Sequence, residues 1–138
     1  MARILLVDDD ADIRLLLRLE LAAEGHQIVE AVNGRVGLDV LATEPIDLVV
    51  LDIMMPVLDG WGVLAELDET SPPVVVITAL ATDGERHVAD ILERGALDVI
   101  AKPFDPGWLV RLVEAVILVE PDERAEYRRR RLARVTRG

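Results

Sequence analysis

The sequence predicts an α/β fold in which a five-stranded parallel sheet forms the middle of three layers. Short runs rich in Val, Ile and Leu alternate along the chain with segments whose apolar residues recur at helical spacing. These runs barely alternate between apolar and polar residues, as expected of strands that helices cover on both faces. Five strand–helix pairs follow one another, which is typical of a parallel sheet. The predicted strands are 3–7, 27–32, 46–51, 73–78 and 97–101.

Each predicted helix has recognisable ends. The second begins near Asn33 and ends before Pro45. The third has Asp59 as its N-cap. The fourth begins with Thr82-Asp83-Gly84-Glu85, which has the spacing of a capping box, and ends at Gly95.

The first and fifth helices also show an apolar face. In the first, Ile13, Leu16, Leu17 and Leu21 recur at helical spacing, and Gly25 is the expected stop. The fifth has Asp105 as its N-cap, with a proline at the first helical position. These signals place all five helices between or after the predicted strands.

Size, charge and composition narrow the class of protein. The 138 residues fit one domain, which we place at 1–120, followed by an Arg-rich tail or short extra helix at 121–138. The absence of cysteine excludes disulfides and thiolate zinc sites. Residues 1–120 carry a net charge of −15, from eight basic and 23 acidic groups, so we do not expect direct nucleic-acid binding. No apolar run reaches the roughly 18 residues of a membrane span, and we expect a cytoplasmic protein.

Charged and polar side chains end four of the predicted strands. Asp8 and Asp9 follow the first strand, Asp52 follows the third, Thr78 ends the fourth, and Lys102, the only lysine, follows the fifth. Right-handed crossovers place the carboxyl ends of parallel strands at one edge of the sheet, where ligands bind at the switch in strand order. We therefore expect these side chains to form one pocket.

The predicted pocket suits phosphoryl chemistry. Three crowded carboxylates need protons or a cation, and carboxylate oxygens suit Mg²⁺. A simpler role remains open for one of the acids among residues 8–12, which could merely cap the first helix. Asp52 can act as a nucleophile that forms an acyl phosphate, while the Thr78 hydroxyl and the Lys102 ammonium neutralise phosphoryl oxygens.

Five motifs, taken together, resemble the receiver domain of bacterial two-component response regulators. They are Val7-Asp8-Asp9-Asp10, Leu51-Asp52-Ile53-Met54-Met55-Pro56, Asp59-Gly60, Thr78-Ala79 and Lys102-Pro103-Phe104. The resemblance covers roughly residues 2–119 and implies a flavodoxin-like, doubly wound (βα)₅ three-layer sandwich. It also implies a cis peptide bond before Pro103, which the small trans preference of X–Pro bonds allows.

The same resemblance implies a function and a set of roles. Asp52 would accept a phosphoryl group from a sensor histidine kinase or a histidine phosphotransfer protein. Asp9 and Asp52 would bind Mg²⁺ directly, with Asp8 acting through water and the Met54 backbone carbonyl as another ligand. Thr78 and Lys102 would contact the phosphoryl group. The chain would then be a phosphoacceptor switch rather than an enzyme, and the family suggests a homodimer through the face of the fourth helix, fifth strand and fifth helix.

One position departs from the family pattern. Receiver domains usually carry Tyr or Phe three residues before the lysine, where this chain has Val99. We therefore expect the response to phosphorylation to appear in the loop after Thr78 and in the fourth helix. Met54 and Leu80 could shield the acyl phosphate from water. His26 and His87 are interpreted as ordinary surface residues.

Two other functions remain open from the sequence. An aspartyl phosphatase of the haloacid-dehalogenase type places its nucleophile on the first strand, and Asp8, Asp10 and Asp12 fit that pattern in part. A phosphorylation-independent interaction module that retains the acidic pocket is the second alternative.

Overall fold

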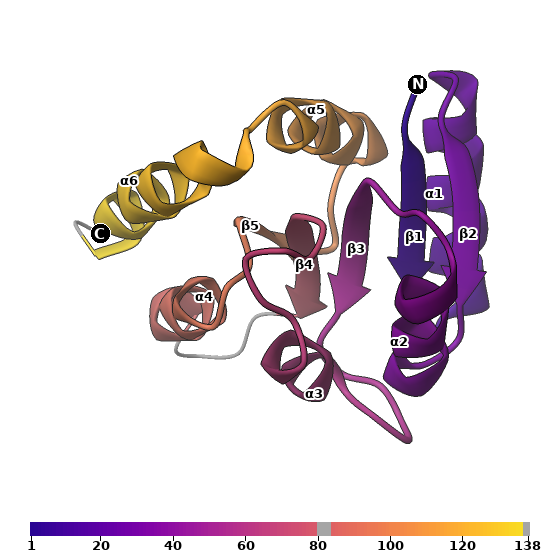
Figure 1. Cartoon of the computed structure of the whole chain (residues 1–138), viewed down its shortest axis with the longest axis horizontal. Coiled ribbons are helices and arrows are strands. Elements are labelled where there is room, and N and C mark those ends of the chain that lie inside the picture. The colour runs from indigo at the N-terminus through magenta and orange to yellow at the C-terminus, as the bar shows by residue number, and fades with distance from the viewer. Residues whose placement is uncertain (80–83, 137–138) are drawn as a thin grey trace.

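Five parallel strands form one sheet at the centre of the molecule (Figure 1). The computed structural model describes residues 1–79 and 84–136. The strands are β1 (Arg3–Val7), β2 (Gln27–Ala31), β3 (Leu48–Asp52), β4 (Val74–Ala79) and β5 (Asp98–Lys102). Their order is β2-β1-β3-β4-β5, so the direction of winding reverses between β1 and β3. The predicted parallel α/β sheet is confirmed, with strand ends within two residues of those expected.

Helices cover both faces of the sheet. They are α1 (Ala11–Ala23), α2 (Gly34–Thr43), α3 (Gly60–Ala65), α4 (Gly84–Glu93), α5 (Pro106–Ile117) and, after a 3₁₀ turn at Pro121–Glu123, α6 (Arg124–Thr136). Successive strand residues point to opposite faces: Leu6 packs with Leu17 of α1 and Leu109 of α5, whereas Leu5 packs with Leu64 of α3 and Ile91 of α4. Two apolar clusters, one on each side of the sheet, therefore hold the three layers together.

The predicted helix ends agree with the structure wherever it describes them. The side chains of Asn33, Asp59 and Asp105 accept hydrogen bonds from backbone N–H groups in the first turns of α2, α3 and α5. Gly25 adopts a positive φ of 90° just after α1, a conformation that glycine adopts without strain. The predicted capping box at 82–85 has its first two residues outside the described part of the chain.

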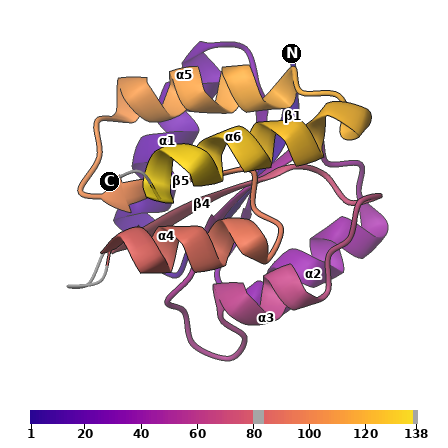
Figure 2. The same ribbon diagram turned by 90° about the vertical axis from the view of Figure 1, so that its left-hand side faces the viewer.

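Helix α6 lies along the open edge of the sheet at β5. Figure 2 shows it between α4 and α5, in front of β5. Its Tyr127 packs against the cluster on the α1/α5 side, and Leu132 and Val135 pack against the cluster on the other side. An uncovered edge strand exposes unpaired backbone groups, so α6 closes the one edge next to α4 and α5.

The arginine run of α6 divides between this edge and solvent. Arg128 donates to the backbone carbonyls of Gly95 and Ala96 at 2.9 and 3.3 Å. Arg131 donates to the Asp98 carboxylate at 2.7 Å. Arg129 and Arg130 instead form ion pairs with Glu126 on the exposed side of the helix. The segment after residue 120 is therefore a docked helix rather than a frayed tail, while the domain boundary at 120 stays a prediction.

None of the helices formed by residues 1–79 and 84–136 is both long enough and apolar enough to cross a membrane.

Candidate functional site

The sheet register brings the predicted site residues to one edge. Val7 of β1 pairs with Leu51 of β3, which places Asp8 beside Asp52. On the other side, Asp52 pairs with Ile77 of β4, and Ala79 pairs with Lys102 of β5. The carboxyl ends of four strands therefore contribute neighbouring side chains.

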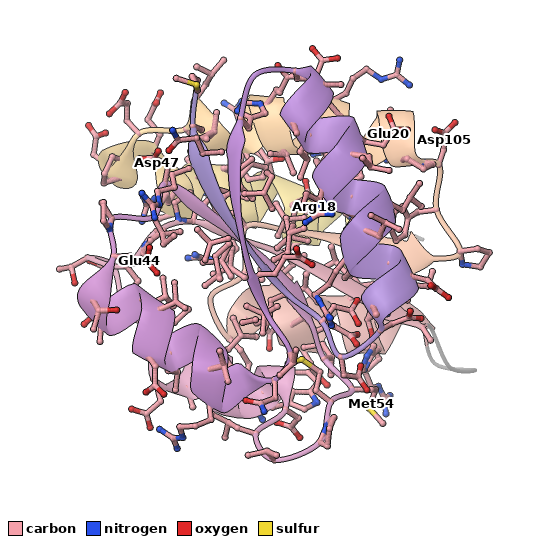
Figure 3. The ribbon with its side chains drawn as sticks, turned by 90° about the vertical axis from the view of Figure 1, so that its right-hand side faces the viewer. Arg18, Glu20, Glu44, Asp47, Met54 and Asp105 are labelled. Carbon is pink, nitrogen blue, oxygen red and sulfur yellow. The ribbon has the colours of Figure 1, made fainter. Side chains whose placement is uncertain are left out.

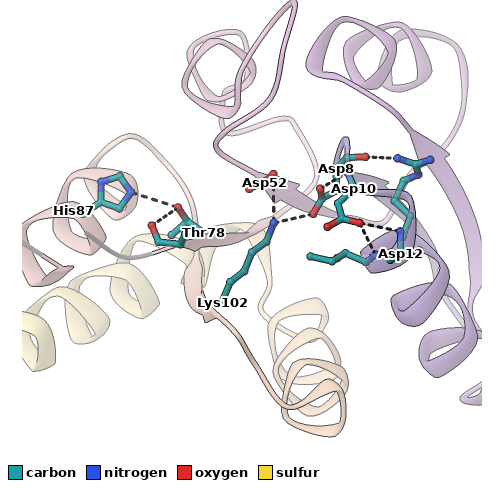
Figure 4. A network of polar contacts seen from close by, with 10 residues as sticks. Asp8, Asp10, Asp12, Asp52, Thr78, His87 and Lys102 are labelled. Carbon is teal, nitrogen blue, oxygen red and sulfur yellow. Dashed lines mark hydrogen bonds and ion pairs between the residues drawn. The ribbon is translucent and has the colours of Figure 1, made fainter. Parts of the chain in front are cut away.

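Lys102 lies between two buried carboxylates. Its Nζ atom is 3.2 Å from Asp8 Oδ2 and 3.4 Å from Asp52 Oδ2 (Figure 4). Asp8 and Asp52 are only 2% and 3% exposed, so their charges are poorly solvated and require this partner. The peptide bond before Pro103 is cis, as expected.

Burial changes the acidity of Asp52. Loss of solvent and the neighbouring Asp8 charge raise its pKa from 3.8 to about 6, although Lys102 and a backbone hydrogen bond with Met54 act in the opposite direction. The group remains mostly ionised at pH 7. It is therefore a carboxylate with an unusually high proton affinity, which favours a nearby cation or reaction with an electrophile.

The three acids at this edge are close enough to share one metal ion. One carboxylate oxygen from each of Asp8, Asp9 and Asp52 lies within 4.8 Å of the others. Asp9 is exposed and gives access from solvent, while the other two are buried. An all-oxygen site that is open on one side fits a hard divalent cation such as Mg²⁺, which retains several waters. This grouping places together the residues that the sequence predicted as carboxylate ligands.

Residues at the start of α1 support the loop that carries Asp8 and Asp9. Asp10 is the N-cap of α1 and accepts hydrogen bonds from the backbone N–H groups of Asp12 and Ile13. The helix-capping role left open for one acid therefore belongs to Asp10. Arg14, which sequence reasoning did not single out, donates to the Asp8 backbone carbonyl at 2.6 Å and pairs with Glu30. The only feature of the sequence that could have indicated this contact is the position of Arg14, one turn into the first helix.

The loop after Asp52 returns closely to the strand that precedes it. The Gly60 backbone N–H donates to the Ile53 carbonyl at 2.8 Å. A Cβ atom at Gly60 would lie 2.5 Å from the Asp52 carbonyl oxygen and 2.6 Å from Ile53 Cα. Val57, at the tip, has a positive φ of 70°, which costs a β-branched residue about 1–2 kcal/mol. Gly60 thus permits the close approach that fixes this loop beneath Asp52.

Replacing Gly60 by alanine should lower the free energy of unfolding by about 2–3 kcal/mol, because the new methyl group meets rigid backbone. The matched control is Gly62→Ala in the same helix, where Cβ would meet the flexible Leu58 side chain instead. Helix propensity favours that change, so it should alter stability by less than about 1 kcal/mol. Urea denaturation of both variants measures the difference, and equal losses would contradict this account of Gly60.

The residues predicted to shield the pocket are only partly described. The Met54 side chain is 72% exposed and lies at the surface of the molecule (Figure 3). Leu80 lies outside the described residues. The proposed roles of Met54, both as shield and as a carbonyl ligand, stay predictions.

Thr78 is fully buried, and its hydroxyl contacts a residue that sequence reasoning had placed on the surface. Its Oγ1 atom lies 3.4 Å from His87 Nε2 of α4, and 3.4 Å from the Ala79 carbonyl. The interpretation of His87 as an ordinary surface residue is wrong, because its ring reaches the site. The nine-residue separation across an undescribed loop gives no sequence pattern that could have revealed this contact.

A parallel sheet with this strand order, whose carboxyl edge carries an acidic cluster and a lysine, defines a flavodoxin-like α/β domain with an acidic pocket. The family model described as the response regulator receiver domain matches residues 4–114. The chain belongs to this family.

Curated relatives and solved structures agree with that assignment. The probable transcriptional regulator ycf27 of Porphyridium aerugineum is 40% identical over 116 residues, which are 83% of this chain and 48% of the relative. The response regulator GtcR of Aneurinibacillus migulanus is 36% identical over 128 residues, which are 88% of this chain and 52% of the relative. The chain therefore spans about half the length of these curated relatives.

Two solved structures show the same fold. The receiver domain of the Francisella response regulator 1452 superposes with a TM-score of 0.79 at 28% identity, covering 85% of this chain and 97% of that one. A CheY-like receiver domain protein from Methanospirillum hungatei JF-1 gives a TM-score of 0.78 at 26% identity, covering 91% and 98%. The flavodoxin-like α/β fold expected from the sequence is confirmed.

Proposed function

We propose that this chain is a phosphorylatable switch of a two-component His–Asp phosphorelay, with Asp52 as the phosphoacceptor. The observation that carries the proposal is the position of Asp52: it is buried at the end of β3, is 3.4 Å from Lys102 and has a pKa raised to about 6. A carboxylate held in this way is ionised at neutral pH yet poorly solvated. Both properties favour its attack on phosphorus.

The donor is a phosphohistidine on a sensor histidine kinase or a histidine phosphotransfer protein. An oxygen of Asp52 attacks phosphorus, the new O–P bond forms as the P–N bond breaks, and the departing electron pair stays on the donor's imidazole nitrogen. That nitrogen takes up a proton from water. Lys102, whose Nζ atom is 3.4 Å from Asp52 Oδ2, would hold a phosphoryl oxygen as a point charge.

The acidic cluster fits Mg²⁺, with Asp8, Asp9 and Asp52 as the residues that would hold it. The ion supplies positive charge to the phosphoryl oxygens when bound. The chain's own contribution is to keep the three carboxylates converged through the Asp10 cap and the Arg14 contact with the Asp8 carbonyl. The family resemblance adds the Met54 carbonyl to this set.

Two features of the structure bear on the alternatives. A phosphatase of the haloacid-dehalogenase type would need Asp8, Asp10 and Asp12 to act together. The Asp10 carboxylate, however, is engaged in capping α1. A homodimer through the α4, β5 and α5 face stays a prediction, and it requires α6 to leave β5, because α6 packs there.

Intact mass measured after incubation with acetyl phosphate and Mg²⁺ tests the proposal. The wild-type chain should gain about 80 Da, the mass of one phosphoryl group. The Asp52→Asn variant should gain nothing, and chelation of the metal should suppress the gain in the wild type. A wild-type chain that stays unlabelled would favour a phosphorylation-independent module, whereas turnover of a phosphate monoester would favour a phosphatase.

A further inference from the structure

The residue that usually accompanies the switch threonine is absent from this chain. Val99 of β5 occupies the position where the family carries an aromatic residue, and it is buried in the same apolar cluster as Val88 and Ile91 of α4. A small β-branched side chain packed in this way cannot swing between a buried and an exposed rotamer as a large ring can. Any coupling between phosphorylation, sensed at Thr78, and the position of α4 must therefore use another side chain.

The Thr78 hydroxyl is held weakly in this structure. Its two contacts, to the Ala79 carbonyl and to His87 Nε2, are both 3.4 Å long. Hydroxyl hydrogen bonds in proteins are usually about 2.7–2.8 Å long when the acceptor is oxygen. Thr78 itself is 0% exposed, so water does not compensate for these long contacts. A phosphoryl oxygen on Asp52 would be a much stronger acceptor, because charged acceptors form shorter and stronger hydrogen bonds.

The His87 ring also contacts an aromatic side chain, which has a cationic neighbour of its own. Trp61 of α3 packs against it edge to face, with ring centroids 5.7 Å apart and an interplanar angle of 82°. The Arg94 guanidinium, at the end of α4, lies 5.0 Å from the Trp61 ring. Figure 4 shows His87 on the side of Thr78 away from Lys102.

We infer that His87 is a positioning residue for Thr78 and takes over the part that the missing aromatic residue plays in the family. Without a phosphoryl group, His87 Nε2 shares the Thr78 hydroxyl and keeps it turned toward α4. When Asp52 carries a phosphoryl group, the hydroxyl donates to a phosphoryl oxygen, and the contact with His87 is lost. The first turns of α4, where His87 lies, then lose this polar contact with β4. This inference rests on the proposed function.

Beryllofluoride, an analogue of the phosphoryl group, provides the test in the presence of Mg²⁺. We expect the ¹⁵N resonance of His87 Nε2 to move on addition of beryllofluoride toward its value in the unliganded Thr78→Ala variant. His26, the only other histidine, accepts a hydrogen bond from the Ala2 backbone at 3.1 Å far from this contact and is the internal control. Its ring resonances should stay in place.

The His87→Ala variant gives an independent readout. It removes a contact made only in the unliganded state, so it should tighten the binding of beryllofluoride about 2- to 10-fold, the range of one net hydrogen bond. In a Thr78→Ala background the same substitution should change nothing, because the hydroxyl is already gone.

Two results separate the failure of this inference from that of the proposed function. Beryllofluoride binding to the wild type with no movement of the His87 Nε2 resonance, and with equal affinity in His87→Ala, would overturn the inference alone. Failure of the wild type to bind beryllofluoride or to be labelled at Asp52 would overturn the proposed function and this inference with it.

Discussion

Replacing Asp52 by asparagine should stabilise the metal-free protein at pH 7 by about 3 kcal/mol, even though it removes the proposed phosphoacceptor. The pKa of Asp52 is raised to about 6 in the folded state, from an ordinary value of 3.8. Ionising it at neutral pH therefore costs the folded state about 3 kcal/mol relative to the unfolded chain. Asparagine has no charge to desolvate, and the attraction between Asp52 and Lys102 is already included in this net cost.

The pH dependence of this difference follows from the direction of the shift. A carboxyl group with a raised folded pKa binds its proton more tightly in the folded state, so the wild type has the full benefit of protonation below about pH 4. That benefit is lost as the pH rises through about 6. The two proteins should therefore have nearly equal free energies of unfolding at pH 4. Above pH 6, the free energy of unfolding of Asp52→Asn should exceed that of the wild type by the largest amount.

Urea denaturation between pH 4 and 7.5, with a chelator present, measures this difference. Asp39→Asn is the matched control, because Asp39 is exposed on α2 and should show no such trend. If the free energies of unfolding of Asp52→Asn and wild type differed by a constant amount over this pH range, the raised pKa of Asp52 would be contradicted. Addition of Mg²⁺ should narrow the gap at pH 7, because the ion stabilises only a site that keeps all three carboxylates.

The sheet and the acidic pocket could be predicted from the sequence because both follow from local patterns. Buried parallel strands read as apolar runs, and the topology of such a sheet brings their carboxyl ends together. Asp8, Asp52 and Lys102 each directly follow or end such a run. Their meeting at 3.2 and 3.4 Å therefore required no knowledge of how the helices pack.

The His87 contact could not be predicted in the same way. Whether a side chain in the second turn of α4 reaches the end of β4 depends on the angle at which that helix crosses the sheet. No periodicity of the sequence encodes this angle. The replacement of an aromatic residue by Val99 was visible in the sequence, but the side chain that compensates for it was not.

The docking of α6 is a second feature that the sequence left open. A run of four arginines from 128 to 131 is usually a solvated face. In the structure, helical periodicity turns Arg128 and Arg131 toward β5 and leaves the other two exposed. The Arg131 side chain binds Asp98, which the sequence placed within the predicted strand 97–101 but did not single out.

Replacing Asp98 by alanine should release α6 from the sheet and lower the stability of its docking by about 3 kcal/mol. Asp98 is 5% exposed and accepts three hydrogen bonds, from the Val99 backbone at 2.8 Å, Arg131 Nε at 2.7 Å and the Tyr127 hydroxyl at 2.7 Å. Burial and the Asp98 carboxylate raise the pKa of Tyr127, so the phenol stays protonated and donates. Removing one member of a buried ion pair leaves the others unpaired, at a cost of about 3–5 kcal/mol.

Trypsin measures the release directly, because α6 carries the arginines at which trypsin cleaves. A change of about 3 kcal/mol raises the population of undocked helix roughly 100-fold, and cleavage follows that population when opening is fast. Tyr127→Phe, which removes one hydrogen bond to a charged group, should accelerate cleavage less, since such a bond contributes about 1.5–3 kcal/mol. Asp39→Ala, on the exposed side of α2, should leave the cleavage rate unchanged. If Asp98→Ala were cut within α6 no faster than wild type, the buried carboxylate would not be what holds this helix over β5.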